Sequence, residues 1–217
     1  MQMKIKLLLI LMLCAASFSR VSAQTQSNRW NTLFVEYNSI SYLVDIANTD
    51  DESLTGISAG YSQFVPISPE SPMCVEIGGA VQYAFKQDFY DKDDTDINLF
   101  SVRVPLNLAY AFELPNSSIL FIPFAGVSGR FNFAGNVKYT GGTKDQDWNL
   151  FDKKDMKELR LTTDLKPFNR FQFGWQLGAK VKLGESFLIG LAYGSDMSEL
   201  AKKVTLSTLT FSAAYMF

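Results

Sequence analysis

The last fourteen residues of the chain, 204–217, alternate in polarity up to the final residue. One face of this segment is apolar, and the opposite face carries small or polar side chains. The apolar set consists of Leu209, Phe211, Ala213, Tyr215 and Phe217. A period of two residues is typical of a β-strand with one face in an apolar environment. The segment therefore predicts a long closing strand, and such a strand requires partner strands elsewhere in the chain.

Seven further segments alternate in the same way, which gives eight predicted strands. Their ranges are 30–46, 54–65, 74–86, 97–113, 119–133, 170–183 and 187–193. In the first of them the apolar positions change parity near Ser39, and a β-bulge is the simplest explanation. The connections alternate between long or polar and short. This order predicts antiparallel strands with loops on one side of a membrane and turns on the other.

The N-terminal residues 1–23 have the three sections of a secretory signal peptide. Lys4 and Lys6 precede an uncharged run over residues 7–18, and small residues follow at positions 21–23. The apolar run is shorter than the roughly 20 residues that a helix needs to span a bilayer. We expect export, removal of this segment, and a mature domain over residues 24–217.

Composition excludes several classes of function. Removal of residues 1–23 takes away three basic residues and no acidic one, so the net charge falls from −2 to −5. This balance excludes a nucleic-acid binder that depends on phosphate contacts. The chain has no histidine, so neither Ser–His hydrolysis nor metal binding by imidazole is available. A mechanism that uses only the carboxylates of Glu36 and Glu76 stays open, but nothing in the sequence fixes their geometry; we expect no catalytic activity and no cofactor.

Alternation alone also fits a soluble barrel with an apolar interior. Three features favour the membrane. Several strands have a dozen or more residues, enough to cross a bilayer at a tilt. Aromatic residues gather near both ends of the strands, as in the interface belts of membrane barrels. The opposite face contains Gly78, Ala80, Ala84, Gly174 and Gly178, which suit a narrow lumen. The sequence therefore predicts an all-β fold, an eight-stranded transmembrane antiparallel up-and-down β-barrel with its apolar face in lipid.

An eight-stranded barrel is just wide enough to be filled by side chains. If the apolar face meets lipid, five charged residues project inward: Glu36, Glu76, Arg103, Arg130 and Lys180. Buried charges are costly unless they are paired. We expect a structural network of salt bridges in the lumen; the alternative interpretation is a path for protons or ions.

Four segments carry a resemblance to a known family: 102–112 (VRVPLNLAYAF), 121–133 (FIPFAGVSGRFNF), 173–182 (FGWQLGAKVK) and 209–217 (LTFSAAYMF). They resemble the eight-stranded outer-membrane β-barrel domain family often labelled porin-like, related in architecture to OmpX and the OmpA barrel. The resemblance implies a location in the outer membrane of a Gram-negative envelope and carries over no catalytic residue. It also implies a C-terminal assembly signal, formed by Phe211, Tyr215 and Phe217, that the barrel assembly machinery reads.

The segment 134–169 is the candidate functional loop, because 36 residues without predicted structure are unusual between strands. Its start, 136–139, and its end, 158–165, are candidates for a paired extension beyond the membrane. We expect a flexible loop whose replacement costs the fold little unless it is paired. The acidic loop 88–96 lacks the glycine and the final acid of a calcium loop, so a solvated loop is the preferred interpretation.

These features favour a structural or partner-binding barrel that acts through its extracellular loops. The expected partners are outer-membrane lipid, the barrel assembly machinery and an unknown extracellular or envelope protein. The alternative is a small pore or transporter for ions or small solutes.

Overall fold

The computed structural model describes residues 29–44, 52–69, 71–87, 94–113, 119–141, 145–159, 167–201 and 204–217. The predicted signal peptide, residues 88–93 of the acidic loop and residues 160–166 lie outside this part of the chain.

The described residues form strands and one short helix. The strands are β1 (Trp30–Val44), β2 (Glu52–Pro66), β3 (Met73–Lys86), β4 (Thr95–Tyr110), β5 (Phe112–Glu113), β6 (Leu120–Tyr139), β7 (Gln146–Asn149), β8 (Phe171–Leu183), β9 (Phe187–Asp196) and β10 (Val204–Met216). The helix, α2, spans Lys153–Leu159. No helix in the described ranges is long and apolar enough to cross a bilayer.

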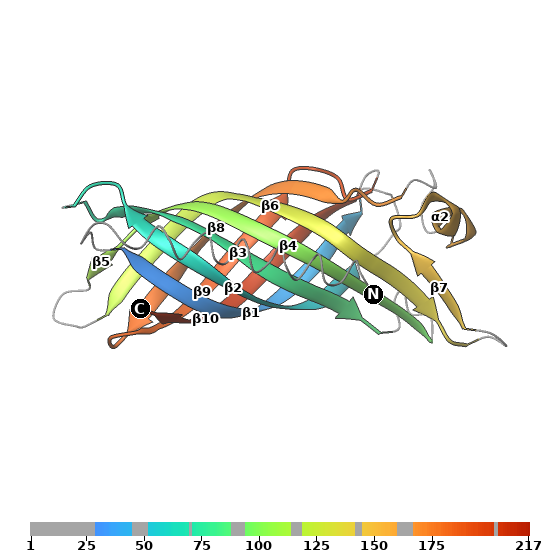
Figure 1. Cartoon of the computed structure of the whole chain (residues 1–217), viewed down its shortest axis with the longest axis horizontal. Coiled ribbons are helices and arrows are strands. Elements are labelled where there is room, and N and C mark those ends of the chain that lie inside the picture. The colour runs from blue at the N-terminus through green and yellow to red at the C-terminus, as the bar shows by residue number, and fades with distance from the viewer. Residues whose placement is uncertain are drawn as a thin grey trace, which may run out of the picture.

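The eight long strands close into an antiparallel barrel (Figure 1). Their order is β4-β3-β2-β1-β10-β9-β8-β6, and β4 also pairs with β6, which completes the ring. The short strands β5 and β7 each pair with β6 and lie outside the ring of eight. The predicted eight-stranded antiparallel barrel is therefore confirmed.

The pairing register fixes the tilt of the strands. A path of directly paired residues that leaves β1 at Asn31 returns to β1 at Ser41, ten residues further along. The residues on this path are Asn31, Gln63, Ile77, Leu106, Val127, Trp175, Ser195, Ser207 and Ser41. This shear of ten on eight strands corresponds to a tilt of about 40° from the barrel axis.

The apolar face of the strands points outward, as the sequence predicts. In β8, Phe171, Phe173, Trp175 and Leu177 are exposed, whereas Gln172 and Gln176 between them are buried. The same pattern leaves large apolar side chains of the other long strands exposed on the outer surface, among them Leu33, Val35, Ile57, Ile77, Val104, Leu106, Ile189 and Phe211.

Aromatic side chains form contacts at both ends of this outer surface. At the turn end, the ring of Phe112 lies 5.8 Å from that of Tyr110 and 5.4 Å from that of Phe121. At the loop end, the ring of Phe100 lies 4.5 Å from that of Tyr83 and 6.0 Å from that of Phe133. These two levels agree with the predicted interface belts.

The predicted bulge near Ser39 is wrong. β1 pairs in continuous register with both β2 and β10 across this position, so Ile40 and Tyr42 point inward instead of continuing the outer face. The register shift lies elsewhere, in the pairing of β4 with β6: Phe100 pairs with Ala134 and Ser101 with Asn132. The reason for the inward apolar residues of β1 is the packing at the loop end of the lumen, described below.

Candidate functional site

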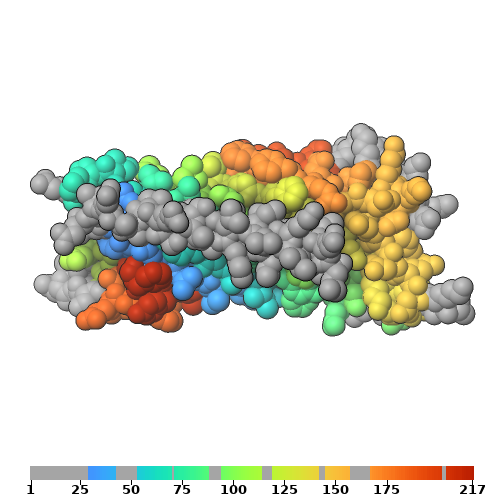
Figure 2. All heavy atoms as spheres, viewed as in Figure 1, coloured from blue at the N-terminus to red at the C-terminus, as the bar shows by residue number. Residues whose placement is uncertain are grey.

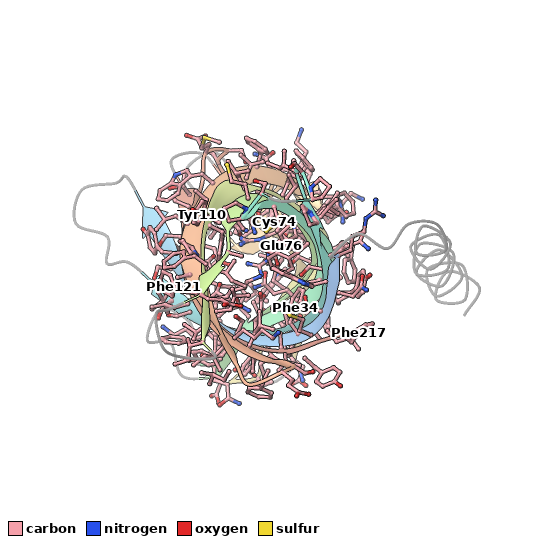
Figure 3. All side chains as sticks on the ribbon, turned by 90° about the vertical axis from the view of Figure 1, so that its left-hand side faces the viewer. Phe34, Cys74, Glu76, Tyr110, Phe121 and Phe217 are labelled. Carbon is pink, nitrogen blue, oxygen red and sulfur yellow. The ribbon has the colours of Figure 1, made fainter. Side chains whose placement is uncertain are left out.

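The lumen is closed at its turn end by an apolar cluster. Phe64, Cys74, Ile122, Leu188 and Met216 are buried there, together with Ala109 and Phe124. Cys74 is 2% exposed in this cluster, as expected for a small apolar residue. Figure 3 looks into this end of the barrel and shows side chains inside the ring, with Phe34, Cys74 and Glu76 labelled there and Phe217 on the outside.

Above the apolar cluster, Glu76 of β3 forms an ion pair with Lys180 of β8 across the lumen. The second carboxylate oxygen, Oε2, accepts a hydrogen bond from Asn107 Nδ2 at 2.9 Å, and Oε1 accepts one from Ser62 Oγ at 2.8 Å. Lys180 Nζ also lies 5.0 Å from the centroid of the Phe64 ring. A carboxylate that is only 2% exposed is therefore compensated by one cation and two neutral donors.

A second group joins Glu36 of β1 to Arg103 of β4 by an ion pair. Ser58 Oγ donates a hydrogen bond to Glu36 Oε2 at 2.8 Å and accepts one from Asn38 Nδ2, also at 2.8 Å. Thr210 Oγ1 donates to Asn38 Oδ1 at 2.9 Å, so the group extends to β10. The Glu36–Arg103 pair crosses the lumen between strands that are not neighbours in the sheet, whereas the hydrogen bonds join β1 to its neighbours β2 and β10.

The third group contains a residue that the sequence analysis missed. Arg130 Nη1 of β6 lies 3.3 Å from Asp196 Oδ2 of β9, and Arg130 Nη2 lies 3.3 Å from Thr208 Oγ1. Asp196 lies beyond the end of the predicted strand 187–193, so the sequence pattern did not place it in the lumen. With Asp196 included, three carboxylates pair with three cations in the middle of the lumen, so these six charges sum to zero.

Little free space remains between these groups. A cavity of about 30 Å³ lies beside Glu36, Glu76, Arg103 and Lys180. One water molecule needs about 10–15 Å³ on the same measure, so this space holds two or three. The rings of Phe34 and Phe124 occupy adjacent space, and a Cβ atom at Gly60 or Gly178 would meet them at 2.6 Å and 2.8 Å.

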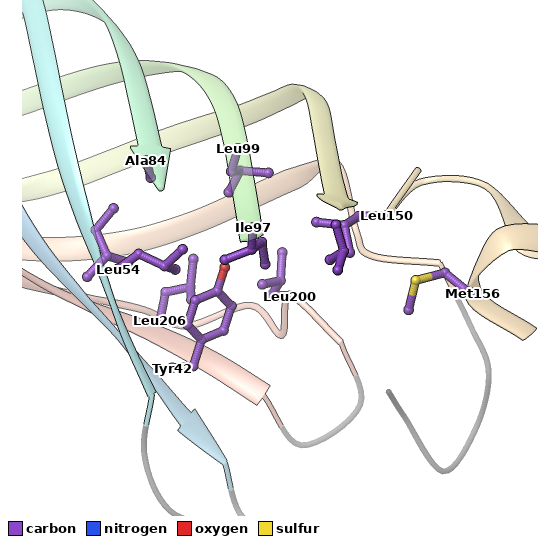
Figure 4. Packing of buried hydrophobic residues seen from close by; sticks show 11 residues of the cluster. Tyr42, Leu54, Ala84, Ile97, Leu99, Leu150, Met156, Leu200 and Leu206 are labelled. Atoms are coloured by element: carbon purple, nitrogen blue, oxygen red, sulfur yellow. The ribbon is translucent and has the colours of Figure 1, made fainter. Parts of the chain in front are cut away.

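The loop end of the lumen is filled by a second apolar cluster (Figure 4). Its members are Ile40, Tyr42, Leu54, Ala84, Ile97, Leu99, Val137, Leu150, Met156, Leu200 and Leu206. The inward apolar residues of β1 belong to this cluster, which explains the change of parity in their sequence. From the level of the loop-end aromatic residues upward, the barrel has an apolar interior like that of a soluble domain.

A cap formed by β7, α2 and the residues around them closes this end. Leu150 and Met156 come from the cap and are fully buried in the loop-end cluster. Leu150 N donates a hydrogen bond to Gly135 O at 3.0 Å, and Phe168 N donates one to Leu150 O at 3.0 Å. In Figure 2 the segment that carries β7 and α2 forms the right-hand end of the molecule.

Two contacts hold the cap against the rim. The guanidinium of Arg170 lies 4.4 Å from the centroid of the Phe151 ring, and its Nη1 donates to the carbonyl oxygen of Phe133 at 3.0 Å. Gly135 lets the cap approach β6 closely, since a Cβ atom there would meet Leu99, Phe151 and Leu150 side chains at 2.7–3.3 Å.

The expectation of a flexible loop over 134–169 is therefore wrong in its described part. Residues 136–139 do form a strand, but they pair with Gln146–Asn149 of β7 and not with 158–165. Residues 158 and 159 belong to α2. The physical reason is burial, because this segment supplies apolar side chains to the top of the lumen.

The three residues of the predicted assembly signal lie on the outer surface of β10 and at its end. Phe211, Tyr215 and Phe217 are 51%, 55% and 58% exposed. The rings of Tyr215 and Phe217 lie 6.2 Å apart. Phe217 also exchanges two backbone hydrogen bonds with Asn31, at 2.9 Å and 3.0 Å, so the chain end completes the pairing of the last strand with the first.

In the described ranges no group of three or more His, Cys, Asp or Glu side chains is placed to hold a metal ion. Glu36 and Glu76, the two carboxylates of the conceivable acid–base mechanism, are each engaged with a different cation.

The model of the outer membrane protein β-barrel domain family matches residues 7–217. The chain belongs to this family. Its location is therefore the outer membrane, and the exposed apolar belt of the barrel faces lipid.

Solved structures with similar folds are distant in sequence. Ail, the attachment invasion locus protein of Yersinia pestis, is 12% identical with a TM-score of 0.48, over 87% of this chain and 98% of that one. Neisserial surface protein A is 15% identical with a TM-score of 0.43, over 89% and 100%. The outer membrane enzyme PagL is 12% identical with a TM-score of 0.40, over 82% and 97%. A search of curated proteins found no match.

Proposed function

We propose that this outer-membrane barrel has a structural and partner-binding role, with no catalytic activity, and that the cap presents its recognition surface. The observation that carries the proposal is the filled lumen: two apolar clusters enclose three ion pairs. Such an interior leaves no room for a substrate. The cap, by contrast, holds a defined shape outside the membrane.

The cap surface supports recognition because it is ordered and polar. Gln146, Asn149, Lys153 and Lys154 are exposed, while Leu150 and Met156 beneath them are buried. Within the cap, Asn149 N donates to Asp155 Oδ2 at 2.9 Å, which joins β7 to α2. An ordered surface loses less conformational entropy on binding than a flexible loop. The proposed partner is an extracellular or envelope protein.

A surface-only variant tests this role. Substitution of Gln146→Ala, Lys153→Glu and Lys154→Glu changes exposed side chains and leaves the buried residues of the cap in place. We expect capture of the partner in cross-linked cells to be lost, while the barrel still shows the shift in electrophoretic mobility on heating that folded barrels show. The matched control reverses two exposed charges at the turn end, Glu113→Lys and Glu185→Lys, and keeps the partner.

If the cap variant retains the complete partner set, recognition does not lie on the cap.

The second candidate function, a small pore or transporter, rests on the polar middle layer of the lumen. It predicts ion conductance and is addressed by electrical recording.

We also propose that Phe211, Tyr215 and Phe217 form the signal read by the assembly machinery. Deletion of Phe217 removes one exposed aromatic side chain and two backbone hydrogen bonds to Asn31. We expect slower insertion into the outer membrane with unchanged export, measured by pulse-labelling and by the fraction of heat-sensitive barrel over time. Substitution of Phe217→Tyr keeps the hydrogen bonds and an aromatic ring, so it is the control. Normal insertion of the deletion variant would contradict the assignment.

A further inference from the structure

The outer surface differs between two halves of the barrel at the level of the loop-end aromatic residues. On β3, β4, β6 and β8 the outward residues at this level are aromatic: Tyr83, Phe85, Phe100, Phe131, Phe133 and Phe171. On β1 and β2 the outward positions carry hydroxyl groups instead: Ser39, Ser41, Ser53 and Thr55. Ser207 of β10, next to them, is 7% exposed.

The shear of the barrel shows that these two sets lie at one level. The pairing path climbs ten residues along β1 in one circuit of eight strands, from Asn31 to Ser41. A line perpendicular to the barrel axis therefore does not follow the paired residues. At each successive strand it lies slightly more than one residue closer to the turn end than the path does. Such a line drawn from Ser41 passes beside Thr55, Phe85, Phe100, Phe133 and Phe171.

The hydroxyl residues are direct neighbours. Ser41 pairs with Ser207 on one side and with Ser53 on the other, and Ser39 pairs with Thr55. We call Ser39, Ser41, Ser53 and Thr55 the hydroxyl row. Just below it, the outward residues of β10, β1 and β2 are Leu209, Tyr37 and Ile57, which are 37%, 49% and 55% exposed. The apolar belt thus ends on the order of 8 Å lower on this side, at about 3.3 Å per residue along tilted strands.

The turn end has no matching displacement. At the level of Tyr110, Phe121, Phe187 and Tyr215, the outward positions of β1 and β2 are the polar residues Asn31 and Gln63. A tilt of the barrel would lower both ends of the belt on the same strands. On β1 and β2 the belt ends lower at the loop end but does not reach lower at the turn end, so the belt is thinner there than on the other half.

From this difference we propose that the hydroxyl row contacts the uncharged polar layer of the outer leaflet, which consists of ester carbonyls, headgroup hydroxyls and their water. This layer descends along β1 and β2. A short apolar belt is accommodated by local thinning of the bilayer. Hydroxyl groups held in hydrocarbon would lack hydrogen-bond partners. The row carries no cation for a phosphate, and none of the Trp, Tyr or Arg residues that dominate protein interfaces.

Nitroxide labels at matched levels test the proposal. The background is the predicted mature chain, residues 24–217, with Cys74→Ala, which leaves no other cysteine. Single cysteines are introduced at Ser41 and Thr55 in the row, and at Phe171 and Phe131 on the aromatic side. Phe171 and Phe131 are 63% and 47% exposed, so they are accessible for labelling. Each labelled protein is reconstituted in vesicles of dioleoylphosphatidylcholine, and folding is checked by its heat-dependent mobility.

The measured quantity is the ratio of collision rates of the label with a water-soluble nickel chelate and with oxygen. We expect this ratio to be at least threefold higher at Ser41 and Thr55 than at Phe171 and Phe131. Equal ratios at the two sides would overturn the proposal, because the polar layer would then lie at one height. Protection of Ser41 and Thr55 from both reagents would also overturn it, since a second copy of the chain would then cover the row. If one labelled variant fails to fold, the comparison uses the other labelled position on the same side of the barrel.

Discussion

Replacement of Glu76 by leucine is expected to lower the free energy of unfolding by about 3–5 kcal/mol, because it leaves the Lys180 ammonium group in the lumen without its counter-ion. Asn107 and Ser62 would also lose the acceptor of their hydrogen bonds. Urea unfolding in detergent micelles or vesicles, followed by tryptophan fluorescence, measures the change.

The second substitution, Lys180→Met, provides the matched test of the pair. A buried ion pair replaced on both sides by apolar groups is often neutral. We therefore expect the double variant Glu76→Leu/Lys180→Met to regain most of the lost stability. The control Glu185→Gln changes an exposed carboxylate at the turn end and should alter stability by less than about 0.5 kcal/mol. If the single Glu76 variant is as stable as wild type, the pair does not stabilise the lumen.

Truncation of Leu150 to alanine is expected to destabilise the cap by about 2–5 kcal/mol, because the side chain is fully buried among the loop-end cluster. The effect should be local: the cap becomes susceptible to protease while the strands in the membrane stay protected. Limited proteolysis of intact cells, with mass spectrometry of the fragments, measures this. Lys153→Ala, on the exposed face of the cap, is the control and should leave the protease pattern unchanged.

Replacement of residues 141–166 by a short linker is expected to destabilise the loop end of the barrel, because Leu150 and Met156 are buried there. Such a linker removes Leu150 and Met156 and exposes the apolar lining that they cover, including Ile97 and Val137. We expect a barrel that still inserts but has an unstable and aggregation-prone loop end. An unchanged loop end in the shortened protein would show that the cap is not part of the core.

The period of two residues was enough to predict the eight strands and their faces within the membrane. In β8 each inward and outward residue is assigned correctly, because lipid on one side and a narrow lumen on the other impose a strict alternation. The rule loses its meaning at the loop end of the barrel, where the inside becomes apolar. Ile40 and Tyr42 therefore looked like a bulge in a lipid face, although they line an interior.

The local sequence pattern did not predict which side chains of distant strands contact each other in the lumen. Which cation lies opposite Glu36 or Glu76 depends on the shear of the barrel, which brings β1 to β4 and β3 to β8 across the lumen. Asp196 lay in a polar stretch with no alternation, so its place beside Arg130 depends on the pairing of β9 with β8 and β10. The seven residues of α2 are too few for a clear helical pattern, and tertiary packing through Met156 decides their structure.

We propose that the filled lumen excludes transport and leaves recognition to the extracellular cap. Electrical recording of single molecules in planar bilayers tests this claim most directly, with the purified, folded wild-type barrel at high salt. The two apolar clusters and the paired charges predict a membrane that stays electrically silent after insertion is verified by heat-dependent mobility and protease protection. Discrete, long-lived conductance steps from the wild-type protein would contradict the account and establish the lumen as a pore.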